Sequence, residues 1–345
     1  MKISICIIAK NEEQYLPRLL DSIGSECDVV VLDTGSTDKT VEIAKKFGAN
    51  VQHFKWTNSF ADARNAAASY AKHDWIMWLD ADMWLPAGEL KKAEDLIDRM
   101  PNQIDSITFK VIDSSCTFQS PRVYKKGLQF AGNVHEDFRP KNSITTPFII
   151  YHQRDEKPED RKIKDAVYEK MLLDEYQNDN KSLHALMYLR DLAMYRQDYK
   201  KAKLYCHQFL EIEDDYICNY YLSTIHYEEK NYKEALDCAF KALQSNGKDP
   251  RVYGAIANIY DEIGQKIDAL TFYHLSMNLP PESRLVNTKY AIQDDCYSVI
   301  PLCNIAKIYL DVGDKEKAMR CYQQALQINP NTIHRSLIEQ NMSKI

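Results

Sequence analysis

The sequence predicts an α/β domain followed by an all-helical repeat domain, and three observations support this fold class. Apolar, strand-like runs alternate with helical patterns through about the first 155 residues. Such alternation is typical of a Rossmann-like, mostly parallel sheet with helical crossovers. After Pro158 the strand signals disappear, and an internal repeat takes their place. We therefore expect an α/β domain over residues 1–155 and a helical linker with repeats over residues 156–345.

Composition limits the class of protein. The chain has 345 residues, 45% of them hydrophobic and 27% charged, which is ordinary for a globular protein. Its net charge of −6 argues against general nucleic-acid binding, because such domains are usually basic. No apolar run approaches the ~18 residues of a membrane span, and no signal-peptide pattern opens the chain. The nine cysteines lack zinc-site spacing, so we expect reduced thiols in a cytoplasmic protein.

The elements of the first domain follow from apolar runs and their boundaries. A run that is rich in β-branched residues predicts a strand, and a period near 3.6 predicts a helix. Gly48 terminates the second of these helices, and Pro86 stands near the start of the fourth. We expect strands over 3–9, 29–32, 50–54, 75–79, 104–112 and 147–151, helices over 15–23, 41–47, 60–71 and 86–100, and a hairpin over 122–130.

Polar groups gather where the predicted strands end. Asn11-Glu12 follows the first strand, Asp33 ends the second, and Asp80 and Asp82 end the fourth. Ligands of open α/β sheets bind at the carboxyl ends of the strands, and carboxylates beside phosphates hold Mg²⁺ or Mn²⁺. The two aspartates alone would also fit a solvated turn. Because no glycine-rich phosphate loop is present, dehydrogenase and ATPase functions are disfavoured.

Four motifs occur in this order over the first 85 residues: Ser4–Glu12, Val31–Thr40, Phe60–Asn65 and Leu79–Asp82. Together they resemble the family 2 glycosyltransferases of the GT-A fold. The resemblance implies an inverting, metal-dependent enzyme of the hexosyltransferase type that uses a nucleotide-sugar, most simply a UDP-sugar. The physical reason for a metal is that the leaving group is a nucleoside diphosphate, whose developing charge the cation stabilises.

The resemblance also implies roles for individual residues. Asp33 would hydrogen-bond the uracil or the ribose, and Arg64 would lie near the base or the diphosphate. Asp80 would contact the ribose or the water shell of the metal. Asp82 would ligate the Mn²⁺ or Mg²⁺ ion. The donor-binding set implied in this way is Ala9, Asn11, Glu12, Asp33, Arg64, Asp80 and Ala81.

The segment Gly132–Asp137 places His, Glu and Asp in one glycine-containing loop, where a general base could be presented. A solvated loop with an incidental histidine is the alternative. The segment resembles the Val-His-Glu stretch of a sub-branch of family 2, which implies that Glu136 or Asp137 is the base. His152 matches a second histidine of that sub-branch, and an imidazole can join a carboxylate on such a metal. The family usually continues with Gly, whereas Gln153-Arg154 follows here.

The second half of the chain repeats itself. Four alanines, Ala202, Ala235, Ala269 and Ala318, occupy matching positions and lie 33, 34 and 49 residues apart. The first two intervals match the ~34-residue tetratricopeptide period, and the third contains an insertion over 280–295. We expect most tyrosines here to pack between helices. The last unit fits best, through Ala306, Tyr309, Gly313, Ala318, Tyr322, Ala325 and Pro330.

The repeats suggest partners. Both halves together resemble the bacterial peptide S-glycosyltransferases, which implies a peptide or protein acceptor on the concave face of the repeats. A cell-envelope saccharide or a lipid-linked acceptor is the alternative, and a homodimer through the repeats is compatible with either. Two other classes stay open. One is a non-catalytic tetratricopeptide scaffold with a degenerate transferase domain, and the other is a nucleotidyltransferase, which also uses paired aspartates and a metal.

Overall fold

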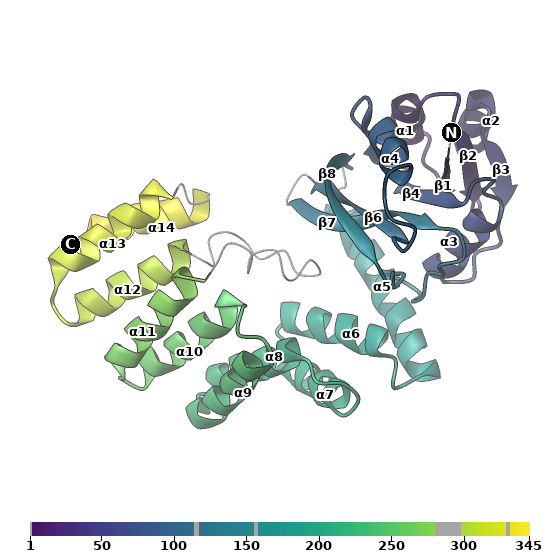
Figure 1. Ribbon diagram of the computed structural model, residues 1–345. Coiled ribbons are helices and arrows are strands. Elements are labelled where there is room, and N and C mark those ends of the chain that lie inside the picture. The colour runs from purple at the N-terminus through teal and green to yellow at the C-terminus, as the bar shows by residue number, and fades with distance from the viewer. Residues whose placement is uncertain (1, 114–116, 155–157, 280–297, 329–331) are drawn as a thin grey trace. The chain divides into compact units, whose positions relative to one another are not determined.

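The computed structural model describes residues 2–113, 117–154, 158–279, 298–328 and 332–345 (Figure 1). These residues form two compact units, Met1–Asn180 and Lys181–Ile345. The first contains every strand in the described ranges, and the second is helical. No helix among the described residues is both long and apolar enough to cross a membrane.

The first unit is built on one mixed sheet with the strand order β3-β2-β1-β4-β7-β6-β8-β5. Strands β1 to β4 run parallel, as the alternation of strands and helices predicts. Beyond β4, strand β7 pairs antiparallel with both β4 and β6, while β6 and β8 are parallel. The strands are Ile3–Ala9 (β1), Asp28–Asp33 (β2), Asn50–His53 (β3), Trp75–Asp80 (β4), Met83–Trp84 (β5), Ser106–Asp113 (β6), Thr117–Lys125 (β7) and Ser143–His152 (β8).

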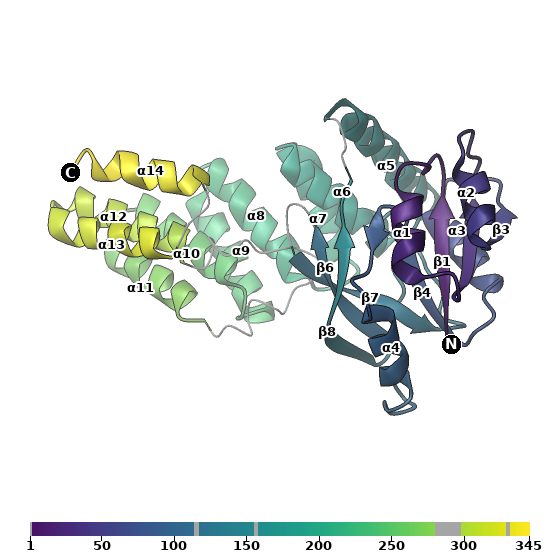
Figure 2. The same ribbon diagram turned by 90° about the horizontal axis from the view of Figure 1, so that it is seen from above.

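Helices cover both faces of this sheet (Figures 1 and 2). Because successive strand residues point to opposite faces, the side chains of β1 and β4 pack alternately into two separate cores. Trp75, Met77 and Leu79 join the core under α1, α2 and α4, whereas Ile76 and Trp78 join the core under α3. The helices of this unit are Leu16–Ile23 (α1), Thr40–Phe47 (α2), Phe60–Ser69 (α3), Glu89–Ile97 (α4) and Pro158–Asn178 (α5).

Two details of the first unit concern the sequence predictions. The hairpin expected over 122–130 is wrong, because β7 ends at Lys125 and pairs with β4 and β6 instead. The preceding segment, which carries few apolar residues, supplies the rest of that strand. Helix α5 belongs to the first contact unit, where Tyr168 packs edge-on against Phe60. The domain limit near residue 155 stays a prediction.

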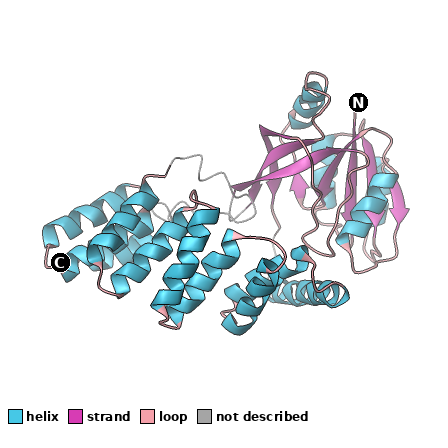
Figure 3. Cartoon of the chain, turned by 60° about the horizontal axis from the view of Figure 1, so that its bottom comes forward, coloured by secondary structure: helices cyan, strands magenta, loops and turns pink. Residues whose placement is uncertain are grey.

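The second unit consists of helices that pair into hairpins (Figure 3). The pairs α6/α7, α8/α9, α10/α11 and α12/α13 each contact closely, and α14 packs against α13. The bounds are Leu183–Tyr195 (α6), Tyr199–Leu210 (α7), Tyr216–Glu228 (α8), Tyr232–Ser245 (α9), Pro250–Glu262 (α10), Lys266–Met277 (α11), Val299–Asp311 (α12), Lys315–Gln327 (α13) and Thr332–Met342 (α14).

The repeat positions read from the sequence have a structural meaning. The four matching alanines lie in the second helix of each hairpin, and each is fully buried. A residue with a positive φ angle, between 59° and 81°, stands five positions before each alanine. It turns the chain between the two helices, and it is glycine only at Gly264 and Gly313. Pro330 and the whole insertion expected over 280–295 lie outside the described residues.

Candidate functional site

The parallel strands bring the predicted polar groups to one edge of the sheet. Ala9, the last residue of β1, is in register with Asp33, the last residue of β2. On the other side of β1, Ile8 is in register with Asp80, which ends β4. The strand order reverses direction around β1, and such a switch point is where open α/β sheets bind ligands. Ala81, the residue between the two aspartates, is buried in the core below.

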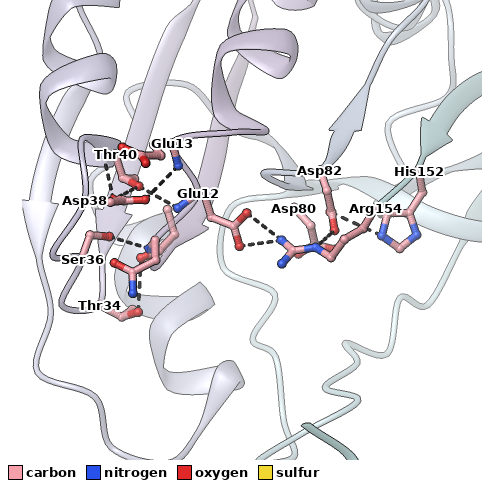
Figure 4. Close-up of polar contacts among 12 residues, drawn as sticks. Glu12, Glu13, Thr34, Ser36, Asp38, Thr40, Asp80, Asp82, His152 and Arg154 are labelled. Carbon is pink, nitrogen blue, oxygen red and sulfur yellow. Dashed lines mark hydrogen bonds and ion pairs between the residues drawn. The ribbon is translucent and has the colours of Figure 1, made fainter. Parts of the chain in front are cut away.

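The loops that follow β1 and β2 are tied to each other (Figure 4). The backbone N–H of Asn11 donates to Ser36 Oγ at 2.9 Å, and its side-chain oxygen accepts from the Thr37 N–H at 2.8 Å. Asn11 adopts φ = 57°, a left-handed conformation that asparagine tolerates better than most residues. The Glu12 N–H donates to Thr40 Oγ1 at 2.7 Å. These bonds fix the backbone of two predicted donor-site residues.

The carboxylate of Asp33 mainly accepts hydrogen bonds from its own turn. It accepts from the N–H groups of Gly35 at 3.3 Å and Ser36 at 3.0 Å, and it pairs with His53 Nδ1 at 3.2 Å. Burial alone would raise the pKa of Asp33, but the hydrogen bonds that it accepts lower it below its ordinary value. The residue therefore stays ionised while shaping the β2–α2 loop.

Asp80 belongs to a set of five side chains that we call the arginine cluster: Arg64, Trp78, Asp80, Arg122 and Glu136. Arg64 donates to Asp80 at 2.8 Å and forms a second ion pair with Glu136. Arg122 lies 3.9 Å from the other Asp80 oxygen. Both guanidinium groups stack on the Trp78 ring, at 4.2 and 3.8 Å from its centre. Three predicted site residues are thus in one ion-pair network.

The two arginines of this cluster are held differently. Burial disfavours the charge of Arg64, but its two carboxylate partners outweigh that effect and raise its pKa. Burial lowers the pKa of Arg122 to about 10. Its Nε and Nη1 atoms have no hydrogen-bond partner in the described part of the chain. The pKa of Asp80 is lowered, because the attraction of both arginines exceeds the effect of burial.

Asp82 belongs to a second set, the Asp82 cluster: Glu12, Asp82, Asp113, His152 and Arg154. Figure 4 shows Glu12, Asp82, His152 and Arg154 of this set. Its Oδ1 atom lies 3.3 Å from His152 Nε2, and its Oδ2 atom accepts from Arg154 Nε at 2.6 Å. The same guanidinium donates through Nη2 to both oxygens of Glu12 at 2.6 Å. The other ring nitrogen of His152 lies 2.8 Å from Asp113. Arg154 therefore bridges Glu12 and Asp82, and His152 lies beside Asp82 Oδ1.

The end of β8 is anchored beside Asp82 by backbone contacts. Strand β5 pairs with β8 and sets Met83 opposite His152. The Gln153 N–H donates to the Asp82 carbonyl at 3.2 Å, and Arg18 donates to the carbonyls of both residues. These contacts place the side chains on either side of Gln153 next to the Asp82 carboxylate.

The protonation of the Asp82 cluster follows from its pairs. Burial would raise the pKa of Asp82, but contacts with His152 and Arg154 lower it well below its usual range. The bond to Asp82 raises the pKa of His152. The pKa of Glu12 is raised, because burial outweighs its bonds to Arg154.

The side chains around Asp82 match the ligands of a divalent cation in part. Asp82 Oδ1 is buried and has no hydrogen-bond partner in the described residues, and it faces an imidazole nitrogen. A carboxylate oxygen beside an imidazole suits Mn²⁺, and Mg²⁺ would use the carboxylate. No group of three or more His, Cys, Asp or Glu side chains that could hold a metal occurs in the described ranges. The residues thus fit a cation that takes its remaining ligands from a bound phosphate.

The loop with the two candidate bases separates them. Ala131 and Asp137 pair through both backbone N–H groups, and His135 between them has φ = 55°. The side chain of Glu136 is only 8% exposed and is held by Arg64. Asp137 is exposed, and its Oδ1 atom accepts from the Phe138 N–H at 2.8 Å. Glu136 therefore joins the arginine cluster, whereas Asp137 faces solvent.

The site contains residues that sequence reasoning assigned no role. Arg122 was attributed to a hairpin, and Trp78 to a buried strand. Asp113 ends β6 and gave no signal. Arg154 did give one, because Gln153-Arg154 follows His152 where the related family usually continues with glycine. That departure marked the position that now bridges Glu12 and Asp82.

The sheet order, the helical crossovers and the acidic strand ends define a Rossmann-like α/β ligand-binding unit, which a helical repeat unit follows. The family model of glycosyl transferase family 2 matches residues 4–201, and that of the tetratricopeptide repeat matches residues 299–332. The first match covers more than half of the chain. The chain therefore belongs to glycosyl transferase family 2, with a GT-A-type first unit and tetratricopeptide repeats in the second.

Individual relatives agree with both halves. A protein named as an uncharacterised glycosyltransferase of Rickettsia conorii is 31% identical over 44% of this chain and 56% of its own length. The glycosyltransferase SunS of Bacillus subtilis is 31% identical over 42% of this chain and 36% of its own. A TPR repeat-containing protein of Synechococcus elongatus is 45% identical over 24% and 20%. The chain thus spans between about a fifth and just over half of these relatives.

Two solved structures are similar at a lower level. The crystal structure of S. aureus TarS 1-349 in complex with UDP-GlcNAc has a TM-score of 0.40 and 15% identity over 95% of this chain and 92% of that chain. The crystal structure of MamA also has a TM-score of 0.40, with 15% identity over 56% of this chain and all of that chain.

Proposed function

We propose that this chain is a metal-dependent, inverting glycosyltransferase that moves a sugar from a UDP-sugar to a side chain of a peptide or protein. Family membership supports glycosyl transfer. One observation carries the metal-dependent donor site: the buried Oδ1 of Asp82, which has no hydrogen bond among the described residues, lies 3.3 Å from His152 Nε2 at the edge where β1, β2 and β4 end.

The donor would bind across the strand ends. Asp33 is fixed by its own turn and would hydrogen-bond the uracil or the ribose. Asp80 is oriented by Arg64 and is the more exposed of the two aspartates, with 34% of its side chain accessible, so it suits a ribose hydroxyl. The fixed backbone of Asn11 and Glu12, with the buried Ala9 and Ala81, would form the floor of this site.

Asp82 and His152 would hold Mn²⁺ or Mg²⁺ together with the donor's phosphate oxygens. When bound, such a cation stabilises the negative charge that develops on the departing nucleoside diphosphate. The protein contributes the orientation of both ligands. Asp113 fixes the His152 ring from its far side, and a carboxylate in that position typically sets the tautomer and strengthens a metal-binding imidazole.

Asp137 is the better supported of the two candidate bases. A general base needs a lone pair that the acceptor hydroxyl or thiol can reach. The Glu136 side chain is buried on Arg64, whereas Asp137 lies next in the chain with its carboxylate exposed. We therefore assign deprotonation of the acceptor to Asp137 and positioning of Arg64 to Glu136.

The acceptor is proposed from the second unit. Stacked helical hairpins form extended surfaces that bind polypeptides, which favours a peptide or protein over a cell-envelope saccharide or lipid-linked acceptor. The repeats could also support a homodimer without affecting the donor site.

Thermal shifts test the donor site directly. UDP-, GDP-, CMP- and dTDP-sugars are screened with and without Mn²⁺, because a ligand at 100 times its dissociation constant stabilises by about 2.7 kcal/mol. We expect a metal-dependent shift with UDP-sugars that Asp82→Asn abolishes, along with at least about a 100-fold loss of donor turnover. Asp21→Asn, an exposed position on α1, is the matched control.

Three outcomes would contradict this proposal. Full turnover by Asp82→Asn in the presence of Mn²⁺ would remove the metal role. The absence of a shift with every donor, in folded protein, would favour a non-catalytic scaffold. Consumption of a nucleoside triphosphate with release of pyrophosphate would instead identify a nucleotidyltransferase.

A further inference from the structure

Arg154 joins the two acidic loops of the donor edge. Its guanidinium donates to Glu12, which follows β1, and to Asp82, which follows β4 (Figure 4). It also lies 4.8 Å from the Tyr15 ring. The Arg154 side chain is 32% exposed, so part of it is accessible to solvent. The guanidinium therefore combines two close ion pairs with an accessible surface.

The charges of this contact bear on cation binding. Glu12 and Asp82 would repel each other if they were alone, and the single positive charge between them compensates one of the two. A divalent cation that approaches Asp82 Oδ1 meets the guanidinium already bound to Oδ2 of the same carboxylate. Like charges at this range weaken binding, particularly where burial reduces the screening by water.

A nucleoside diphosphate changes this balance. Its phosphate oxygens are negatively charged and attract both the guanidinium and the divalent cation. Arginine binds phosphate oxygens well. With the diphosphate present, the repulsion between the two cations is offset. Metal and nucleotide should therefore strengthen each other's binding, and by linkage the coupling is equal in both directions.

We propose that Arg154 makes the binding of a divalent cation at Asp82 conditional on the nucleoside diphosphate. The inference rests on the proposed function, since it takes its cation and its diphosphate from there. Arg154 acts through Asp82 and is a positioning residue. Its consequence is that the free protein binds metal weakly and that metal and donor enter the site together.

The experiment measures Mn²⁺ affinity of the full chain by electron paramagnetic resonance and calorimetry, with and without UDP, and with GDP as a second probe. We expect Arg154→Gln to bind Mn²⁺ alone about tenfold more tightly than the wild type, and to lose coupling between metal and nucleotide by a similar factor. UDP alone should bind more weakly to this variant. Arg154→Lys keeps the charge and should resemble the wild type with Mn²⁺ alone.

Lys45→Gln is the matched control, because Lys45 is exposed on α2 and the substitution removes the same charge. It should leave every affinity unchanged. Unchanged or weaker Mn²⁺ binding by Arg154→Gln, in a wild type that binds Mn²⁺ with a nucleotide, would overturn this inference alone. A wild type that binds Mn²⁺ with neither nucleotide would overturn the proposed function as well.

Discussion

Asp80 and Asp82 are one residue apart in the chain, yet they lie in opposite surroundings. Asp80 is the last residue of β4 and is held between two arginines that come from a helix and a neighbouring strand. Asp82 lies in the turn after β4 and is held by two side chains at the end of β8. One of its oxygens has no hydrogen-bond partner in the described chain.

The difference gives the two acids different roles in the proposed donor site. The arginine cluster satisfies its carboxylates with buried, stacked guanidinium groups, and such networks rigidify a site. In the Asp82 cluster, the buried Oδ1 atom of Asp82 has the ion pair with His152 but no hydrogen bond among the described residues, and a bound ligand would supply one. In the proposed function, Asp80 is therefore the acid that the protein holds in place, and Asp82 is the acid that would bind the cation.

The two neighbouring acids of the loop over 131–137 give the largest predicted difference. Glu136 belongs to the arginine cluster, and Asp137 does not. If Asp137 is the base, Asp137→Asn should lower kcat by about 100- to 10,000-fold while leaving the affinity for the donor and the melting temperature unchanged. Steady-state kinetics with the acceptor, together with donor binding by calorimetry, measures both.

Glu136→Gln is the variant to compare with Asp137→Asn. Because it removes a buried ion pair of Arg64, we expect it to lower thermal stability and donor affinity more than kcat. The opposite pattern, with kcat lost only in Glu136→Gln, would make Glu136 the base and remove that role from Asp137.

A second pair of variants compares the two arginines that stack on Trp78. Arg64→Met removes the cation that pairs with both Asp80 and Glu136, so two carboxylates lose their partner. We expect a loss of about 3–5 kcal/mol in the free energy of unfolding. Arg122→Met removes a buried cation that has two nitrogens without a hydrogen bond and a long ion pair with Asp80. The free energy of unfolding should therefore fall by less than about 1 kcal/mol.

Tryptophan fluorescence suits this measurement, because all four tryptophans lie within the first 84 residues. Urea unfolding followed in this way reports the first unit and not the repeats. Equal losses for the two variants would mean that stacking on Trp78, which they share, outweighs the ion pairs.

The sequence predicted much of this fold because its signals are local. The apolar runs of β1 and β4 alternate between two cores, and the four matching alanines mark the second helix of each hairpin. The placement of β7 was missed because its first half is polar and its partners come from distant segments. No local pattern reports such a non-local pairing.

The candidate site was predictable to the same extent. The acids at the strand ends followed from the positions where apolar runs stop, since parallel strands bring those ends together. Their partners did not follow, because Arg122 and Arg154 reach Asp80 and Asp82 across 42 and 72 positions of sequence. Those distant cations decide which acid the protein holds in place and which one would bind the proposed metal.

The smallest predicted effect concerns acid stability and again uses Asp80. Its pKa is lower in the folded protein than the ~3.9 of an unfolded chain, since its two arginines outweigh burial. A carboxylate of this kind contributes stability above the unfolded value, and the contribution is lost as the pH falls through the folded value. The gap in unfolding free energy between the wild type and Asp80→Asn should therefore be full at pH 7 and shrink below pH ~4. Fluorescence-detected urea unfolding from pH 7 to 3, with Asp21→Asn as the exposed control, measures it. A gap that stays constant across this range would mean that the packing of Asp80, and not its charge, contributes to stability. The contrast with Asp82 would then rest only on the Oδ1 atom of Asp82, which has no hydrogen bond among the described residues.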